Sequence, residues 1–366
     1  MIKKIYANAD NTITNAHKRL PNSISAIRAT GSNMGASDIL EVYGLYGNYS
    51  TSSAEISRAL IQFPISEISA SRDAGEIPAS GSVNFFLSLK NAPSEETLPS
   101  DYTISVYAVS SPWQEGFGLD MDHYDDLTYD VVGSNWIRRS GSTSWTTIGG
   151  DYLTATLVTQ SFPNGDEDLS VNVSNIVESW LASNYGNYGF IIKLSQSFEP
   201  YFSSSTGANV TPDIHNPSGS QRSYFTKRFF ARNTEFYFKK PCIEIKWDDS
   251  RKDDRGNFYT SSSLAPAADN LNTLFLYNYV RGQLKNIPAV GTGEIFVDLY
   301  ETLGGSALTQ CINTPATGGY FDTGIYTCSV CVNTTATTIR DVWHTGGVEY
   351  HTGSISTLDL SAATVN

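Results

Sequence analysis

Hydrophobic and polar residues alternate in short runs along most of the chain, and this period of two predicts β-strands. Turn-forming residues rich in Gly and Asn separate the runs, as at residues 31–33, 47–48 and 163–165. A jelly roll or a related double sheet over residues 1–250 is the architecture that this spacing favours. The expected strands cover residues 2–7, 39–46, 55–63, 83–90, 102–109, 152–159, 169–173, 189–194, 225–230 and 242–247.

A change of composition marks a second, smaller domain. Residues 251–270 are first charged and then small and proline-containing, so we predict a linker there. A smaller Ig-like β-sandwich is expected over residues 271–366. Residues 358–366 show no pattern of a closing element, so either the chain is a piece of a longer protein or its last strand is offered to a neighbouring molecule. The predicted strands of this domain are residues 274–280, 293–300, 324–332, 339–343 and 349–351.

One segment, residues 171–194, departs from the strand pattern and predicts a short helix. Asn172, Ser174 and Asn175 offer side-chain caps for its start. Its apolar residues at positions 176, 177, 180 and 181 share one helix face. Gly186 is expected to end it in the left-handed conformation. Such a helix would close an open edge of the sandwich, with Trp180 as its anchor.

The overall charge restricts the class of partner. The chain has 24 Lys and Arg against 37 Asp and Glu, a net charge of −13. Nucleic acid and anionic membranes are therefore not expected partners. No apolar run of a signal peptide or of transmembrane length occurs, so we expect synthesis in a cytoplasm without signal-directed export. A hydrophobic content of 40% is sufficient for ordered cores.

The four cysteines are too few for a disulfide scaffold. Cys328 and Cys331 have the spacing of a redox or zinc motif, but they lie in a run that alternates like a strand. We expect packed thiols there, with a Cys311–Cys328 disulfide as the alternative.

Two clusters suggest ligand binding. Asp120, Asp122 and Asp125 lie close together in one acidic loop, and such carboxylates could hold Ca²⁺. The spacing is not that of an EF-hand, and a solvated loop is the other interpretation. Trp113, Glu115 and Trp145 could form a sugar-stacking site, although tryptophans near strand ends also serve as lids of a core. No sequence motif of a hydrolase, metalloprotease or nucleotide-binding enzyme occurs, so we predict no catalytic residue.

A basic stripe runs from residue 222 to residue 255, with ten Lys and Arg against six acidic residues and with aromatic residues between them. It could bind a copy of the same chain or another acidic neighbour, form a solvated face, or contact nucleic acid. We favour protein docking over nucleic acid. The candidate docking residues are Arg222, Lys227, Arg228, Arg232, Lys239 and Lys240.

Two resemblances to known proteins bear on function. The first domain resembles the DNRLRE family of β-sandwich modules, which is related to carbohydrate-binding jelly rolls. Its matching segments are residues 9–14, 57–63, 106–115, 171–194, 230–232 and 240–245. The chain also resembles structural proteins of marine T4-like tailed phages, and the segments that carry this likeness are residues 28–42, 223–232 and 253–272.

The second resemblance implies a component of the virion, without naming its place in the particle. We therefore expect a non-enzymatic structural protein in capsid decoration, neck, tail or fibre. Its expected partners are other virion proteins and copies of itself, and calcium is the one cofactor expectation. The alternative is an adhesin that binds a host-surface glycan.

Overall fold

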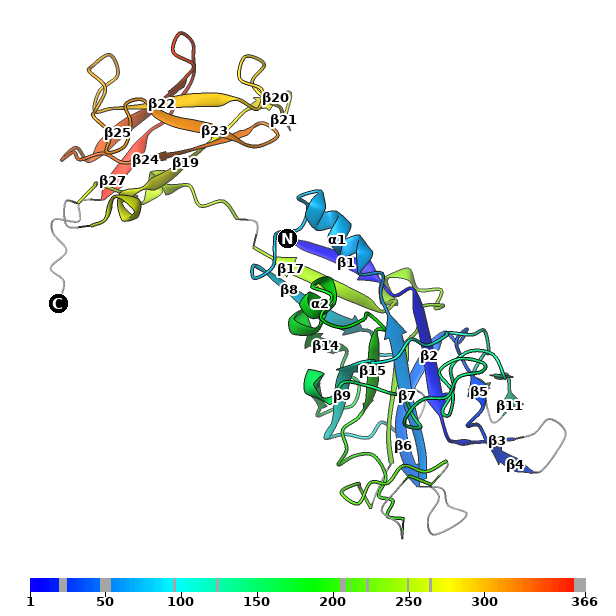
Figure 1. Ribbon diagram of the computed structural model, residues 1–366. Helices are drawn as coiled ribbons and strands as arrows, with labels where there is room; N and C mark the ends of the chain where they lie inside the picture. Colours follow the sequence, from blue (N-terminus) through cyan, green and yellow to red (C-terminus); the bar gives the residue numbers. More distant parts are fainter. Residues whose placement is uncertain are drawn as a thin grey trace, which may run out of the picture. The chain divides into compact units, whose positions relative to one another are not determined.

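The computed structural model describes residues 1–19, 25–46, 54–94, 97–122, 125–204, 209–210, 212–221, 224–248, 250–262 and 265–358. The chain divides into two compact units, residues 1–249 (unit 1) and 250–366 (unit 2) (Figure 1). Strands dominate both units, and the described ranges hold two α-helices, both in unit 1. The prediction of an all-β protein is therefore confirmed. Over the same ranges, no helix has the length and apolar character that a membrane crossing needs.

Two sheets of unit 1 enclose its main core. One is an antiparallel sheet in the order β1 (Ile2–Tyr6), β17 (Cys242–Trp247), β8 (Val83–Leu89) and β14 (Leu169–Asn172). The other runs in the order β13 (Val158–Phe162), β9 (Tyr102–Ala108), β15 (Phe190–Leu194), β7 (Ala54–Gln62), β6 (Ile39–Tyr46) and β16 (Tyr224–Phe230), and β2 (Ala9–Thr14) also pairs with β7. Apolar side chains from both sheets fill the space between them.

The second sheet is buried on both faces. Alternate residues of a strand point to opposite faces, so Ile192 of β15 enters the main core while Ile191 lies on the other side. There it meets Trp136 and Trp145, which come from the long connection between β9 and β13. The same connection contains the short strands β10 (Met121–Asp122), β11 (Asp125–Asp126) and β12 (Tyr129–Asp130). Three more short strands, β3 (His17–Arg19), β4 (Ala26–Arg28) and β5 (Ser32–Asn33), lie between β2 and β6.

The two helices of unit 1 lie beside the smaller sheet. Helix α1 (Ser66–Asp73) lies beside β1 (Figure 1), where Lys3 donates a hydrogen bond to Ser71. Helix α2 (Ser174–Leu181) is the predicted one, and Trp180 is buried against Phe190 as expected. Its ends differ from the prediction. Ser174 accepts from Phe85 N instead of capping the helix.

The left-handed residue after α2 is Ser183, with φ of 57°, and not Gly186. Gly189, with φ of 80°, then turns the chain into β15, and a Cβ there would lie 2.1 Å from the Ile61 carbonyl oxygen. Most predicted strands of unit 1 match the observed ones within two residues. The exception is the strand expected over residues 152–159, where the short 3₁₀ helix η1 (Thr154–Thr156) precedes β13.

Unit 2 is one curled sheet of eight strands. Its order is β18 (Phe258–Tyr259), β27 (Ile355–Leu358), β25 (Thr338–His344), β22 (Glu294–Tyr300), β23 (Ala316–Asp322), β24 (Ile325–Val330) and β19 (Asn272–Tyr277), with β26 (Glu349–Thr352) on β25. A separate hairpin joins β20 (Tyr279–Val280) to β21 (Gln283–Leu284).

The segment predicted as a linker closes this sheet. Asn272 of β19 exchanges two side-chain hydrogen bonds with the backbone of Tyr259 in β18, at 2.8 and 2.9 Å. Asp253 and Asp254, at the 3₁₀ helix η3 (Asp254–Gly256), accept from backbone N–H groups of β19. Phe258 is buried in the core of unit 2. A second 3₁₀ helix, η4 (Ala267–Asn270), follows. The linker prediction for residues 251–270 was therefore wrong.

Two further predictions for unit 2 need correction. Strand β27 pairs with β25 and β18 of the same chain and buries Ile355, so this strand is not offered to a neighbour. The packed thiol expected at Cys331 is wrong, because Cys331 forms a disulfide with Cys311, whereas Cys328 is a buried free thiol as expected and not the partner of Cys311. Cys311 N donates to the Cys331 carbonyl, which brings these two residues together, while Cys328 points into the core.

Candidate functional site

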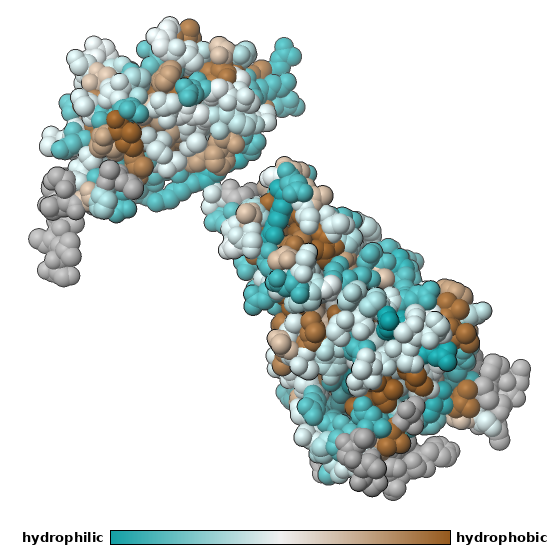
Figure 2. Space-filling model, in the orientation of Figure 1, coloured by the Kyte–Doolittle hydropathy of each residue, from teal (hydrophilic) through white to brown (hydrophobic). Residues whose placement is uncertain are grey.

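The most exposed large apolar side chain that the structure describes is Phe238, which is 84% exposed. It lies in residues 235–240, between β16 and β17, which we call the aromatic loop. Phe236 and Tyr237 beside it are 48% and 56% exposed. The 3₁₀ helix η2 (Tyr237–Lys239) shapes the loop. Three consecutive aromatic side chains are thus presented to solvent. On the face of unit 1 that Figure 2 shows, apolar side chains gather in several separate patches among polar residues.

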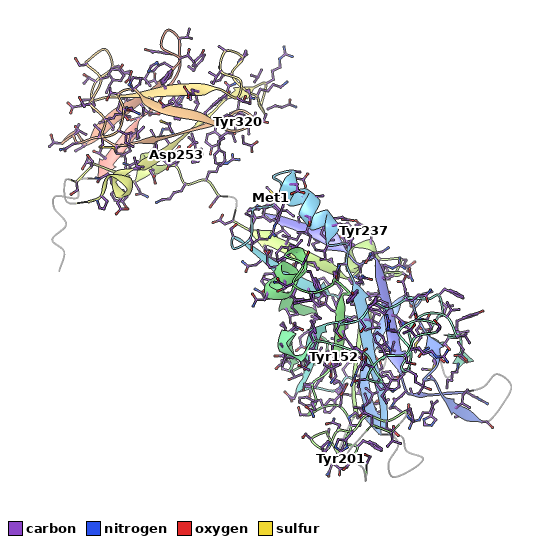
Figure 3. All side chains as sticks on the ribbon, viewed as in Figure 1. Met1, Tyr152, Tyr201, Tyr237, Asp253 and Tyr320 are labelled. Carbon is purple, nitrogen blue, oxygen red and sulfur yellow. A yellow bond between two sulfur atoms is a disulfide. The ribbon has the colours of Figure 1, made fainter. Side chains whose placement is uncertain are left out.

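Ring contacts hold the aromatic loop in place. Tyr237 packs on Tyr6 of β1 with ring centroids 4.9 Å apart, and Phe238 meets Tyr237 edge-on at 5.5 Å. Lys239 Nζ lies 4.6 Å from the centroid of the Phe236 ring. Figure 3 shows Tyr237 on the side of unit 1 that carries β1. Because their side chains are already ordered, these rings would lose little conformational entropy on binding a partner.

An ionic cluster fixes the base of the aromatic loop. Arg232 donates to both carboxylate oxygens of Glu115, at 2.9 and 3.0 Å. Glu115 also accepts from Asp10 N at 2.8 Å, and the buried Asp10 carboxylate accepts from Arg232 N at 2.5 Å. Burial, opposed by that bond and reinforced by the charge of Glu115, raises the pKa of Asp10 to about 7. The cluster thus connects β2 and Glu115 to Arg232, which lies just before the aromatic loop in the sequence.

Four of the six basic side chains predicted to dock a partner make contacts within the chain. Arg228 forms an ion pair with Glu41, and Arg232 binds Glu115. Lys239 lies over aromatic rings. Lys240 is half-buried, and Arg222 lies outside the described residues. Within the aromatic loop, the aromatic side chains are therefore more exposed than the basic ones.

Lys227 is the clearest departure from the docking prediction, because its side chain is buried. Its Nζ donates to Asn91 Oδ1, to the Gly165 carbonyl and to the Glu167 carbonyl, at 2.8, 2.9 and 2.6 Å. The ammonium group also lies 4.9 Å from the centroid of the Phe162 ring. Burial lowers its pKa to about 8, against the attraction of Glu167 and its acidic neighbours. Lys227 thus joins three chain segments inside unit 1.

Replacing Lys227 with methionine is expected to lower the free energy of unfolding of unit 1 by about 3 kcal/mol, because three buried acceptors lose their donor. Urea unfolding followed by tryptophan fluorescence measures this change. Trp343 is the only tryptophan of unit 2, so the signal reports mainly on unit 1. Lys240→Met is the matched control and should leave stability nearly unchanged. Equal stability of K227M and the unchanged protein would contradict the assignment.

The predicted sugar-stacking residues do not form one exposed site. The Trp145 ring is buried, and its Nε1 donates to the Asn135 carbonyl at 2.8 Å. Trp113 is half-buried and donates to the Tyr188 carbonyl. Glu115 is held by Arg232. Both tryptophans cover the outer face of the larger sheet, so the stacking role predicted for Trp145 was wrong.

The calcium prediction stays a prediction. Asp120 accepts a long hydrogen bond from Ser37 Oγ, at 3.4 Å. The side chains of Asp122 and Asp125 lie outside the described residues. Asp126 in the same loop pairs with Lys18 at 2.8 Å, which neutralises part of its charge. Within the part of the chain that the structure describes, no three His, Cys, Asp or Glu side chains gather closely enough to hold a metal ion.

The geometry therefore offers an ordered aromatic surface on unit 1 as its candidate functional site, with a partly buried ionic cluster at the base. In the comparisons with known proteins, no protein-family model and no curated protein matches the chain.

Proposed function

We propose that this protein is a non-enzymatic structural component of a tailed-phage particle and that the aromatic loop binds a neighbouring protein in the assembly. The observation that carries the proposal is the exposure of Phe236, Tyr237 and Phe238 on a loop that is already ordered. Protein interfaces gain most of their binding energy from a few aromatic anchors of this kind. The neighbour is another virion protein or a second copy of this chain.

The resemblance of residues 223–232 to phage structural proteins supports the same proposal, because this segment runs directly into the aromatic loop. The fold agrees with a structural role. Both units are built from strands, and in unit 2 the carboxylates of Asp253 and Asp254 accept hydrogen bonds from the edge strand β19. We further propose that unit 1 is a jelly-roll sandwich of the DNRLRE type and that unit 2 is Ig-like.

The proposal is tested with Phe238→Ala in the phage that encodes the chain. Purified particles with the unchanged protein are expected to contain it in a fixed copy number. The variant should be incorporated at a much lower level, because truncating an aromatic anchor typically costs about 2 kcal/mol or more, or roughly 30-fold in affinity. Quantitative mass spectrometry of the particles measures the copies.

Leu303→Ala is the control, since Leu303 is 61% exposed in unit 2 and lies outside the aromatic loop. It should be incorporated like the unchanged protein. Absence of the chain from purified particles would exclude the structural role. Normal incorporation of Phe238→Ala would show that the aromatic loop is not the contact.

A further inference from the structure

Lys227 and Asn91 meet between the two sheets of unit 1. Asn91 follows β8 of the smaller sheet, and Lys227 lies on β16 of the larger sheet. Asn91 also forms an isolated backbone bridge with Phe229, two residues further along β16. Lys227 Nζ lies 2.8 Å from Asn91 Oδ1, and a C=O bond is about 1.2 Å long, so the amide carbon is within about 4 Å of this nitrogen. A buried amine thus faces a carboxamide.

The surroundings of Lys227 favour its neutral amine, which is the nucleophilic form. The side chain is buried, and the ring centroids of Phe162 and Phe229 lie 4.9 and 5.3 Å from Nζ. Burial lowers the pKa of Lys227 to about 8, so about one tenth of these side chains are neutral at pH 7. A lysine with the ordinary pKa of 10.5 is neutral in fewer than about one molecule in a thousand.

Two backbone carbonyls orient this amine. Lys227 Nζ donates to the Gly165 carbonyl at 2.9 Å and to the Glu167 carbonyl at 2.6 Å. A neutral amine has two N–H groups and one lone pair. When both hydrogens are held by these carbonyls, the lone pair is left for the third neighbour, which is Asn91.

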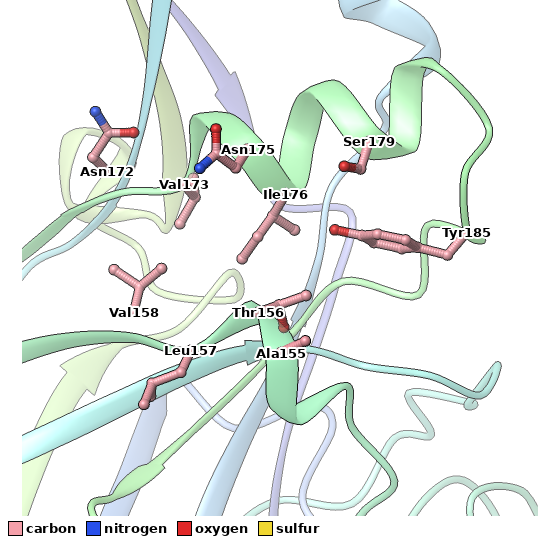
Figure 4. A pocket seen from close by; sticks show the side chains of 10 residues that line it. All are labelled: Ala155, Thr156, Leu157, Val158, Asn172, Val173, Asn175, Ile176, Ser179 and Tyr185. Atoms are coloured by element: carbon pink, nitrogen blue, oxygen red, sulfur yellow. The ribbon is translucent and has the colours of Figure 1, made fainter.

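The loop that supplies the two carbonyls, residues 163–168, is held in place. It joins β13 to β14, and these strands contact each other. Val158 of β13 and Asn172 of β14 line the same hollow, of about 340 Å³, at the ends of the strands that lie away from the loop (Figure 4). Gln160 Nε2 donates to the Asp168 carbonyl at 2.7 Å. The carbonyl acceptors therefore belong to an anchored segment.

The other buried lysines of the described residues, Lys18 and Lys193, face acceptors that do not react with an amine. Lys18 pairs with Asp126, and Lys193 pairs with Glu199. An ionised carboxylate repels a nucleophile, whereas the carboxamide of Asn91 is neutral. Burial lowers the pKa of Lys193 to about 8 as well. The difference therefore lies in the acceptor and not in the amine.

We propose that Lys227 and Asn91 form a covalent amide cross-link. The lone pair of Nζ attacks Cγ of Asn91, so that the Nζ–Cγ bond forms and the Cγ–Nδ2 bond breaks. Asp168, whose carboxylate accepts from Asn91 N at 2.8 Å, takes the proton from Nζ and passes it to Nδ2. Nδ2 then leaves as ammonia with the electron pair of the broken bond. Within the described residues, Nδ2 donates no hydrogen bond that would hold it.

The cross-link would join the two sheets of the sandwich through residues 136 positions apart. It would restrict the unfolded chain as a disulfide of the same span does. Unlike a disulfide, it forms without an oxidant and is not broken by a reductant. The N–H that remains on the new amide can keep one of the two carbonyl bonds. This inference concerns the covalent chemistry of unit 1 and does not depend on the proposed function.

Intact mass spectrometry of the denatured full chain tests the proposal. Loss of ammonia lowers the mass by about 17 Da relative to the sequence. Incubation at pH 8, where about half of the Lys227 side chains are neutral, should drive this loss to completion. After digestion with trypsin, the peptides that contain Asn91 and Lys227 should be joined in one branched species.

Four variants identify the atoms involved. Lys227→Met removes the nucleophile and Asn91→Ala the electrophile, so each should keep the full mass. Asn164→Ala is the matched control, because an Asn before Gly165 can lose ammonia by closing on its own backbone; this variant should still lose about 17 Da. Asp168→Asn should form the link about a hundredfold more slowly, the effect of losing a general acid–base group.

Circular dichroism checks that Asn91→Ala is folded, so that a missing link is not a result of unfolding. The proposal is overturned if the unchanged chain keeps its full mass after incubation at pH 8. It is also overturned if the loss persists in Asn91→Ala or disappears in Asn164→Ala. An unchanged rate in Asp168→Asn would overturn the proton transfer through Asp168.

Discussion

Replacing Glu199 with glutamine is expected to lower the free energy of unfolding of unit 1 by about 3–5 kcal/mol. Glu199 is buried between two cations. Arg58 donates to both of its oxygens, at 3.0 and 3.1 Å, and Lys193 donates to one of them at 2.9 Å. Glutamine removes the only negative charge of this triad and leaves two positive charges inside the protein. Breaking a buried ion pair in this way is among the most destabilising of point changes.

The pKa values show how these charges depend on one another. Burial raises the pKa of Glu199, but the nearby charges of Arg58 and Lys193 outweigh that effect, and the pKa is lowered overall. Burial lowers the pKa of Lys193 to about 8, although Glu199 opposes the change. Without the Glu199 charge, Lys193 would lose its proton at a still lower pH. Part of the cost of E199Q is therefore the cost of deprotonating Lys193.

Urea unfolding at pH 7, followed by tryptophan fluorescence, measures the effect of E199Q. Glu76→Gln is the matched control. Its carboxylate pairs with Lys3 at the surface, where ion pairs contribute little, so stability should hardly change. A loss for E199Q as small as that for E76Q would contradict a structural role for the triad.

The triad explains how one long connection is held on the larger sheet. Arg58 lies on β7 and Lys193 on β15, while Glu199 belongs to the segment after β15. Arg58 Nη1 also donates to the Gly149 carbonyl, at 2.8 Å. The same guanidinium therefore fastens both the connection that contains Trp136 and the segment that contains Glu199. In the sequence, Arg58 and Lys193 are isolated charges in apolar runs, and Glu199 stands in a mixed segment with no sign of either partner, so their pairing was not predictable.

The strands of the sandwich were predictable because their pattern is local. In β9, Ile104 and Val106 face the core in alternate positions, and β15 is an almost continuous apolar run. Helix α1 was missed because its buried face is very small, and Ile68 is its single large apolar residue. Its position follows from contacts with β1 that no local pattern encodes.

The prediction of a linker over residues 251–270 was wrong for a different physical reason. A run of Asp253, Asp254 and other charged residues is typical of a solvated segment. In the structure, these two carboxylates accept hydrogen bonds from the edge of β19 and so take the place of a neighbouring strand. Polar residues that satisfy a sheet edge look like linker residues in a sequence, because hydropathy does not record what a side chain binds.

The sequence contains an indication of the exposed aromatic loop, although the charge pattern around it favours a different interpretation. Phe236, Tyr237 and Phe238 are consecutive, and a strand can turn only every second residue toward one core. At least one exposed ring was therefore to be expected. The docking prediction rests on the Lys and Arg residues around them instead. Most of those pair with acidic or aromatic side chains that are distant in the sequence, as Arg232 does with Glu115.

Replacing Asp10 with asparagine is expected to make unit 1 more stable near neutral pH, and the gain should depend on pH. The pKa of Asp10 is raised from 3.8 to about 7 in the folded chain. Between these values the folded state binds the extra proton, so the stability that Asp10 provides is present below pH 4 and is lost as the pH rises to 7. A shift of about three pKa units corresponds to about 4 kcal/mol.

The difference in unfolding free energy between D10N and the unchanged protein should therefore grow from pH 4 to pH 7 and then level off. The amide oxygen can still accept from Arg232 N. Because the amide is neutral, the repulsion between the Asp10 and Glu115 charges is also removed. Asp168→Asn is the control of opposite sign. Burial raises the pKa of Asp168, but its bonds to Lys90 and to Asn91 N lower it overall, so the Asp168 contribution is lost as the pH falls. Urea unfolding at each pH unit distinguishes the two variants. A D10N difference that stays constant with pH would show that Asp10 does not carry this proton.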